Sequence, residues 1–450
     1  MKKTNSEKGL GLFALVSISA GSSLAGVIST LTLATEQTGR AAWLAYAVAV
    51  VIGGVLRVLP IIFFASMFRY KGGNYAMTTV ALGELMGGIY ALWWLPMFLS
   101  RGTVASALGQ YVNSIFPGIP TMWAGVAITT VLYVVNLFGT QSMTRLQKPL
   151  TTIAMIVLGA FTLLGLFHLQ DGSLALTSPG YFSNGALGYL LAITLVIQST
   201  SAPSLVCGFS WEAEDPQRNI PRAIFLSAGI VFLIYVGISF VASNLLPIEE
   251  AAGKPLTFLA QNLLSGTVLV VFLIAGPLLT LCTSVNSGMT SIAAPVIGAI
   301  RNGWLPRTLG RTNKHGVPWI IYTAMWLICV IPMMLGVSLK AFTAYTVMTQ
   351  RISGMLLLLS GFRIPTKFKE QWKRSALHIP NCIYYPLLTV IACIEIGTLI
   401  MSIRTIPFAA FIGNMVLVML LALYAWIRYQ TGKTNVQILI EDETGQSPIL

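Results

Sequence analysis

A polar segment at residues 197–222 interrupts a long apolar run. Hydroxyl and amide side chains stand where the run should be most apolar, at Gln198, Thr200, Ser201 and Ser204. Within a membrane every backbone N–H and C=O group needs a partner, so a small, polar, proline-containing interruption is tolerated where it lines a cavity. The segment therefore predicts a binding site rather than an ordinary span.

A second group of small and polar residues lies in the first apolar run. It includes Gly21, Ser22, Ser23, Leu24 and Gly26. Close helix packing would explain one pair of small residues, but so many within about three helical turns favour an unwound segment. Gly21 and Ser201 are separated by about the length of five spans. Interrupted helices at matching places in two halves point to a transporter binding site.

Charged residues within the predicted spans form the third set, at Arg57, Arg101, Arg351 and Glu395. A charge at mid-membrane costs about 3 kcal/mol and usually faces a cavity or a partner. Arg351 and Glu395 can pair across helices, or either can gate the pathway. Arg101 either faces the binding site or pairs with an acid or a carbonyl of another span.

Hydroxyl and amide residues also gather in the eighth apolar run, at Thr280, Thr283, Ser284, Asn286 and Ser287. Such side chains can line a cation site or donate hydrogen bonds to carbonyls of their own helix. We favour the second interpretation.

The elements that position these residues follow from composition. The 450 residues are 55% hydrophobic and 9% charged, with a mean hydropathy of +0.78, whereas soluble domains are about 25% charged. A spanning helix needs about 20 apolar residues, and the chain contains roughly twelve such runs. This predicts a single all-α integral membrane domain over residues 1–450, with spans near 10–33, 42–66, 84–112, 121–140, 149–168, 186–211, 223–246, 263–298, 317–337, 341–361, 383–402 and 407–427.

The net charge of +13 reports orientation rather than nucleic-acid binding. If the spans alternate from a cytoplasmic amino terminus, most Lys and Arg fall on the cytoplasmic side, as is typical of membrane proteins. The opposite side holds only Arg40, Lys254, Lys340 and Arg404. We therefore expect both termini in the cytoplasm, no nucleic-acid partner, and a retained first span, since no small-residue cleavage site follows it.

Cysteine and histidine give no sign of a metal or cofactor. The five cysteines lie within or beside predicted spans and form no CxxC pair, and the three histidines are isolated in the sequence. Structural and redox sites need closely spaced ligands. We expect no metal and no cofactor, and the sequence does not indicate an oligomeric state.

Loop motifs carry a resemblance to a known family. Residues 215–223 read DPQRNIPRA, residues 301–306 read RNGWLP, residues 313–318 read NKHGVP, and residues 72–75 read GGNY. In order and spacing these resemble the segments after the sixth, eighth and second spans of the amino acid, polyamine and organocation (APC) permeases, particularly their bacterial amino-acid antiporter branch. The resemblance extends over nearly the whole chain.

The resemblance implies a LeuT-like fold of twelve spans. Two inverted repeats of five spans would occupy residues 1–168 and 186–361, two additional helices residues 383–427, and a cytoplasmic tail residues 428–450. Spans one and six would be broken at the midplane. A substrate carboxylate would then meet backbone N–H groups around Ser22, Ser23 and Leu24, and its amino group would meet carbonyls around Gln198, Thr200 and Ser201, consistent with the charge preferences of helix ends.

The function that the resemblance implies is alternating-access transport of a small amino-acid substrate across the cell (plasma or inner) membrane. Some proton-coupled relatives in the family carry a Lys in span five, which is absent here, so exchange is favoured over symport. Arg101 resembles a pocket position of related antiporters and would favour acidic or neutral amino acids. A proton-coupled symporter and a transporter-like sensor that does not transport remain alternatives.

Two other classes lack support in the sequence. A channel would be expected to show a repeated pore motif or a ring of charges. An enzyme would need paired acids, a histidine cluster or an activated nucleophile within the spans. Neither pattern is found, so we expect no enzymatic activity.

Overall fold

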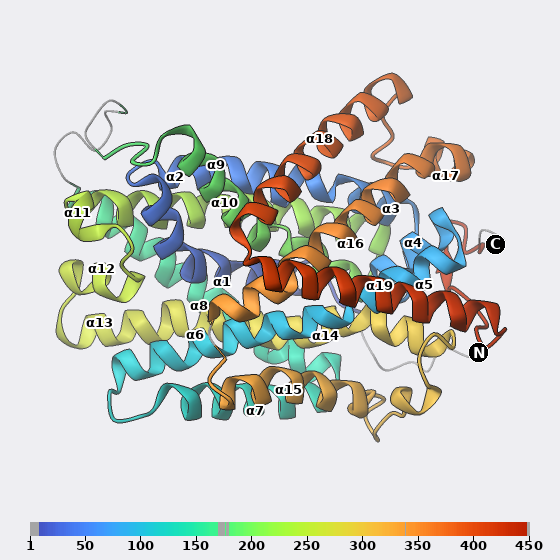
Figure 1. The fold of residues 1–450 in the computed structure, drawn as a ribbon, viewed down its shortest axis with the longest axis horizontal. Helices are drawn as coiled ribbons and strands as arrows, with labels where there is room; N and C mark the ends of the chain where they lie inside the picture. Colours follow the sequence, from blue (N-terminus) through green and yellow to red (C-terminus); the bar gives the residue numbers. More distant parts are fainter. Residues whose placement is uncertain (1–8, 170–175, 177–179, 338, 448–450) are drawn as a thin grey trace.

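The computed structural model is built almost entirely of helices that run along its longest axis (Figure 1). It describes residues 9–169, 176, 180–337 and 339–447. The first and last described residues lie at the same end of the molecule, which we call the terminal end.

The first part of the chain supplies five long apolar segments, several of them divided. Its elements are α1 (Leu12–Thr38), α2 (Ala42–Val50), the π-helix η1 (Val51–Val55), the 3-10 helix η2 (Leu56–Val58), α3 (Leu59–Met67), β1 (Arg69–Tyr70), α4 (Asn74–Leu82), α5 (Glu84–Trp93), the 3-10 helix η3 (Leu95–Leu99), α6 (Ser100–Ile115), α7 (Thr121–Leu137) and α8 (Thr140–Leu166).

The middle part continues with longer and more interrupted helices. Its elements are α9 (Gly185–Thr200), the 3-10 helix η4 (Ala202–Phe209), α10 (Pro216–Asn244), α11 (Ile248–Ala251), α12 (Leu256–Leu263), α13 (Gly266–Leu273), the π-helix η5 (Ile274–Leu278), α14 (Leu279–Arg301), the 3-10 helix η6 (Arg307–Gly310), α15 (Trp319–Met334) and α16 (Leu339–Lys367).

The last part holds α17 (Lys369–Arg374), α18 (Asn381–Thr405), α19 (Phe408–Gln430) and β2 (Ile440–Glu441). β2 pairs antiparallel with β1, with Arg69 opposite Glu441 and Tyr70 opposite Ile440. The end of the chain is thereby attached to the connection that follows α3.

Proline and glycine set many of these boundaries. Prolines precede α12, α15, α18 and α19, where the missing N–H costs no helical hydrogen bond. Pro277 lies inside η5, where its ring cannot fit a regular turn, and a wider π turn results. Gly139, with a φ of 97°, makes the tight connection between α7 and α8.

The expectation that the first span is interrupted is wrong. α1 is continuous from Leu12 to Thr38. Most of its serines donate to carbonyls of the preceding turn, as Ser17 does to Phe13 and Ser23 to Ser19, so their hydrogen bonds form within a regular helix. The small residues serve close packing instead, because a methyl group on Gly26 would overlap the Tyr235 hydroxyl.

The sixth span does change conformation within the membrane segment. α9 ends at Thr200, Ser201 forms a turn, and the chain continues as η4, whose second residue is Pro203. A proline at that position removes one backbone donor, and the 3-10 turns that follow form the tighter i→i+3 pattern.

Two segments expected to be loops are helical. Residues 141–148, which lie between the spans expected at 121–140 and 149–168, belong to α8, which includes Pro149. The segment after the sixth span also becomes helical at Pro216, with Asp215 as the N-cap. Proline in a first turn is compatible with a helix, and the apolar residues that follow continue it.

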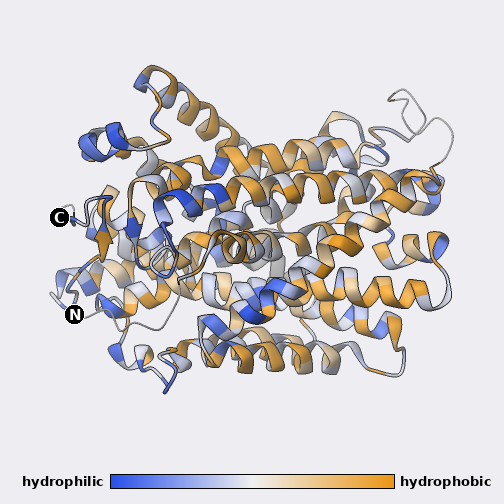
Figure 2. Ribbon diagram, turned by 180° about the vertical axis from the view of Figure 1, so that it is seen from behind, coloured by the Kyte–Doolittle hydropathy of each residue, from blue (hydrophilic) through white to orange (hydrophobic). Residues whose placement is uncertain are grey.

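Eight helical segments in the described ranges are long and apolar enough to cross a membrane, and two shorter apolar helices accompany them. Figure 2 shows hydrophobic residues along the helices and hydrophilic residues gathered most densely at the terminal end. Large apolar side chains such as Phe167, Leu233 and Met419 point outward. The protein is therefore an all-helical multi-pass membrane protein.

Candidate functional site

The candidate site begins where α1 meets α14. Thr283 donates to the Gly21 carbonyl at 3.1 Å, and Ser284 donates to the Ser22 carbonyl at 3.3 Å. Thr283 also donates to Thr280 in its own helix. We expected these hydroxyls to bond within their own helix. That expectation is incomplete, because Thr283 and Ser284 donate hydrogen bonds to α1.

The same part of α1 contacts η4. Ser19 donates to the Pro203 carbonyl at 3.1 Å, and Ser22 donates to the Ala202 carbonyl at 3.2 Å. Ser204 donates to the Ser201 carbonyl at 2.8 Å. The structure thus brings the two polar segments predicted from the sequence into direct contact, although only one of them departs from an α-helix.

The remaining predicted residues of α1 are packed. Ser22, Ser23 and Leu24 are buried within a continuous helix, where a backbone N–H is directed at the carbonyl four residues earlier. These N–H groups are therefore not free for a substrate carboxylate, which corrects that expectation. The Ser23 carbonyl accepts a hydrogen bond from Tyr235.

Thr200 contacts α2. Its hydroxyl donates to the Ala49 carbonyl of α2 at 3.1 Å and to the Ile197 carbonyl of its own helix at 3.0 Å. It therefore anchors α9 to the second span. The side chain of Gln198 lies outside the described part of the chain.

Arg101 projects from α6 toward α14. Its guanidinium donates to the Ser284 carbonyl at 3.0 Å and to the Ser284 hydroxyl at 3.3 Å. Gly288, one turn further along α14, leaves room for it, since a methyl group there would overlap the guanidinium. Among the described residues no carboxylate forms an ion pair with Arg101. Through Ser284, this half-buried cation lies next to Ser22.

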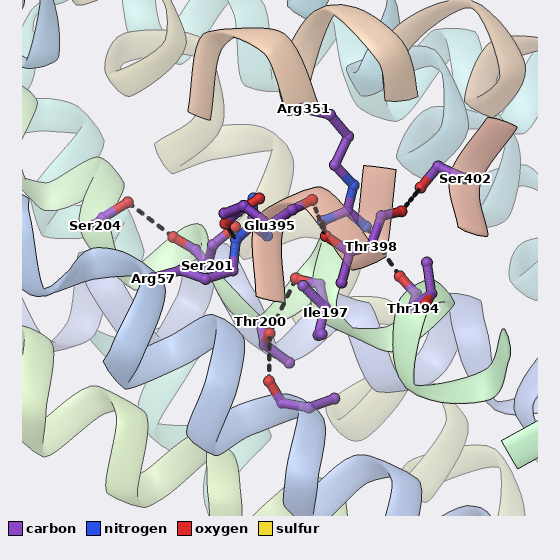
Figure 3. A network of polar contacts seen from close by, with 11 residues as sticks. Arg57, Thr194, Ile197, Thr200, Ser201, Ser204, Arg351, Glu395, Thr398 and Ser402 are labelled. Atoms are coloured by element: carbon purple, nitrogen blue, oxygen red, sulfur yellow. Dashed lines mark hydrogen bonds and ion pairs between the residues drawn. The ribbon is translucent and has the colours of Figure 1, made fainter. Parts of the chain in front are cut away.

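The other three charges form a separate buried group, shown in Figure 3. Glu395 pairs with Arg57 rather than with Arg351. Arg351 donates to the Thr194 carbonyl of α9 at 3.1 Å and to the Thr398 hydroxyl at 3.5 Å. Two cations thus share one acid, and the group fastens α9 to η2, α16 and α18.

A chain of buried amides was missed by the sequence analysis. Gln147 donates to the Ser17 carbonyl at 3.3 Å and accepts from Asn286 at 2.9 Å. Asn136 donates to Asn286 and accepts from Thr290, both at 3.0 Å. Gln147 lies between the spans expected at 121–140 and 149–168, although its position one turn before Thr151 on an extended helix is a usable signal. The chain links α1 to the wall of a cavity.

That cavity, which we call the vestibule, has a volume of about 190 Å³. It is lined by the ends of η4 and α14, the Gly72–Tyr75 connection, Tyr322 and part of the tail after α19. Thr290 forms part of its wall and accepts a hydrogen bond from Tyr322 at 3.1 Å. Its wall on α14 runs from Thr290 to Arg301, and Thr290 lies about two turns beyond Ser284.

Three charged groups line the vestibule: Lys71, Glu212 and Arg301. Surrounding protein atoms raise the pKa of Glu212 although the residue is exposed, while the nearby Lys71 acts in the opposite direction. Partial burial and the charge of Arg301 lower the pKa of Lys71, against the opposing effect of Glu212. The mixture suits a polar, hydrated passage.

Metal-binding side chains do not gather in the described ranges in groups of three or more. The polar groups around α1 are hydroxyls, amides and one guanidinium. Such groups bind a polar organic molecule by hydrogen bonds and charge.

Comparison with known proteins supports transport of a small molecule. The family described as "Amino acid permease" matches residues 10–436. The chain is 23% identical over 330 residues to "Probable threonine/serine transporter YbxG" of Bacillus subtilis (strain 168), covering 69% of this chain and 70% of that protein.

Two further relatives are similarly distant. "Inner membrane transport protein YbaT" of Escherichia coli (strain K12) is 24% identical over 302 residues, covering 64% of this chain and 68% of that protein. "Amino-acid permease RocE" of Bacillus subtilis (strain 168) is 24% identical over 317 residues, covering 66% and 67%.

Proposed function

This chain belongs to the amino acid permease family, within the APC superfamily, and from that premise we propose that it exchanges acidic or neutral amino acids by alternating access. It is a transporter rather than an enzyme. The observation that carries the proposal is Arg101, a half-buried cation beside α1 and α14 without an acidic partner among the described residues.

The charge of Arg101 sets the expected selectivity. A fixed guanidinium favours a substrate carboxylate and opposes a cationic side chain, both by Coulomb attraction and because an incoming cation leaves the arginine unpaired. Neutral amino acids are compatible with this charge as well, since their α-carboxylate can bind the guanidinium. The threonine/serine name of the Bacillus subtilis relative agrees with a small neutral substrate.

The proposed substrate contacts lie around Arg101, Ser22 and Ser284 on one side, and Ser201 and Ser204 on the other. Carbonyls near the C-terminal end of α9 suit an amino group, because that end of a helix attracts cations. The amide chain from Gln147 to Thr290 would connect this site to the vestibule.

We further propose the two-repeat organisation of twelve spans, with repeats at residues 1–168 and 186–361. Interruptions at corresponding places support it: η3 divides the third span and η5 divides the eighth, which is third in the second repeat. We place the protein in the cell membrane with both termini cytoplasmic, supported by the basic residues of the connections and by the shared end of the described termini.

Counterflow in proteoliposomes tests exchange directly. Vesicles loaded with one amino acid at a time should take up the labelled amino acid faster than empty vesicles for at least one acidic or neutral substrate. No acceleration with any amino acid would refute exchange, and uptake into empty vesicles that requires a proton gradient would indicate symport.

Substitution of Arg101 tests selectivity. Arg101→Ala should lose most uptake of acidic substrates, whereas Arg101→Lys, which keeps a positive charge but not the planar donor geometry, should retain part of it. Wild-type uptake and selectivity in Arg101→Ala across an amino-acid panel would exclude this role.

A further inference from the structure

The tail after α19 crosses the vestibule instead of extending away from the membrane domain. Gln437, Ile438 and Leu439 form part of the vestibule wall. The vestibule's other lining comes from elements of the helical domain, including η4 and α14. The tail therefore forms part of the surface that a molecule in the vestibule would contact.

One attachment of the tail is the two-stranded pairing of β2 with β1. The Lys71 N–H donates to the Leu439 carbonyl at 3.0 Å, which extends the pairing toward the vestibule. Ile440 is only 1% exposed and packs in the core cluster that includes Tyr70. This contact ties the tail to the connection after α3.

The second attachment is Asn302, at the end of α14. Its carbonyl accepts from the Asn435 N–H at 3.0 Å, and its side-chain oxygen accepts from the Gln437 N–H at 3.2 Å. The same side chain donates to the Tyr75 hydroxyl at 2.8 Å, and Tyr75 lines the vestibule. The tail thus joins the end of α14 to β1 and Lys71, segments far apart in the sequence.

These attachments are suited to reversible release. Residues 433–439 have no helix or strand of their own, and the contacts described are a few backbone hydrogen bonds and one buried side chain. Each such hydrogen bond contributes only about 1 kcal/mol net. The helices are complete at Gln430, so the tail can detach without unfolding any of them.

We propose that residues 433–441 form an autoinhibitory strap, which restricts the vestibule while bound and must detach for rapid transport. The strap bridges two elements that a rocking motion would move relative to each other. Its bound state therefore opposes both the passage of substrate and the motion. The proposal rests on the proposed transport function, and the tests below separate the two.

A reversible cross-link tests the strap. Arg69 and Glu441 are directly opposed, and opposed residues of an antiparallel pair have Cα atoms about 4.5–5.5 Å apart, within the range of a disulfide. Arg69→Cys/Glu441→Cys, in full-length protein whose native cysteines are replaced by alanine, should lose at least about 5-fold in exchange rate on oxidation. Reduction should restore the rate.

The single variants Arg69→Cys and Glu441→Cys are the matched controls, because Arg69 also donates to the Trp211 carbonyl. Neither should respond to oxidation. A quantitative cross-link that leaves the exchange rate unchanged overturns the strap proposal.

Release is tested with Ile440→Asp, which places a charge in a buried position and should raise the exchange rate about 5-fold or more. Gln446→Asp adds the same charge to an exposed position of the tail and should leave the exchange rate unchanged. An unchanged or lower rate in correctly folded Ile440→Asp, judged by gel filtration and thermal unfolding, contradicts the proposal.

A readout independent of transport is labelling of Thr290→Cys, in the vestibule wall, by a membrane-impermeant maleimide. Labelling should slow when the strap is cross-linked and accelerate in Ile440→Asp. If the labelling rate falls on cross-linking and rises in Ile440→Asp while no amino acid is exchanged, the transport proposal fails and the strap proposal stands. If exchange occurs but the labelling rate is unchanged by the cross-link, the strap proposal alone fails.

Discussion

Arg57 and Glu395 form a buried ion pair although 338 residues separate them in the sequence. Their side chains are 7% and 5% exposed. Arg351 completes the group through Thr398, whose hydroxyl also donates to the Glu395 carbonyl at 3.0 Å. One carboxylate therefore compensates two guanidinium groups, of which Arg351 attaches to α9 (Figure 3).

This arrangement predicts an asymmetry between two substitutions. Glu395→Gln leaves two buried cations without an acid and should destabilise the protein by about 3–5 kcal/mol. Arg57→Gln leaves one cation and one acid and should cost less. Thermal unfolding in detergent measures both, and equal losses would contradict the shared-acid arrangement.

Close packing of α1 predicts the effect of Gly26→Ala. The new methyl group would overlap the Tyr235 hydroxyl and Ser199, so overpacking should cost about 1–3 kcal/mol. Gly229→Ala in α10, where an added methyl group meets open space, is the control and should be neutral or slightly stabilising because alanine favours helices. If thermal unfolding shows no loss of stability in Gly26→Ala, α1 packs less closely against Tyr235 and Ser199 than the structure indicates.

Gly288→Ala should alter transport more than stability. Its methyl group would push the flexible end of Arg101 away from Ser284, moving the charge that we propose selects the substrate. We expect at least about a tenfold loss in uptake of acidic amino acids, equivalent to 1.4 kcal/mol, with little change in unfolding temperature. The matched variant Gly159→Ala, which meets open space in α8, should transport normally.

Glu212 predicts a pH dependence of stability. Its pKa is raised in the folded protein above the ordinary carboxyl value of 4.5, so the folded state holds this proton more tightly than the unfolded state. The contribution is fully present at lower pH and is lost as pH rises through the raised pKa.

The expected result is that the unfolding temperature of the wild type falls relative to that of Glu212→Gln as pH rises from about 4 to about 7. Glu214→Gln, at an exposed position in the same connection, controls for the loss of one negative charge. A difference between wild type and Glu212→Gln that grows in the opposite direction would show that the environment of Glu212 favours its charged form.

The sequence by itself determined the class of the protein. Runs of about 20 apolar residues leave a helical membrane domain as the stable arrangement, because hydrocarbon requires internal backbone hydrogen bonds. The loop motifs alone indicate the permease family, and the family match over residues 10–436 confirms it. These signals are local, so they can be read along the chain.

Only the tertiary structure decided what the polar residues contact. The serines of α1 were compatible with an unwound helix or a packed one, and the neighbours Tyr235, Thr283 and Ser284 decide for packing. Glu395 had two arginines available, and the packing of α18 against η2 selects Arg57. Partners separated by hundreds of residues depend on how helices pack, which no local pattern specifies.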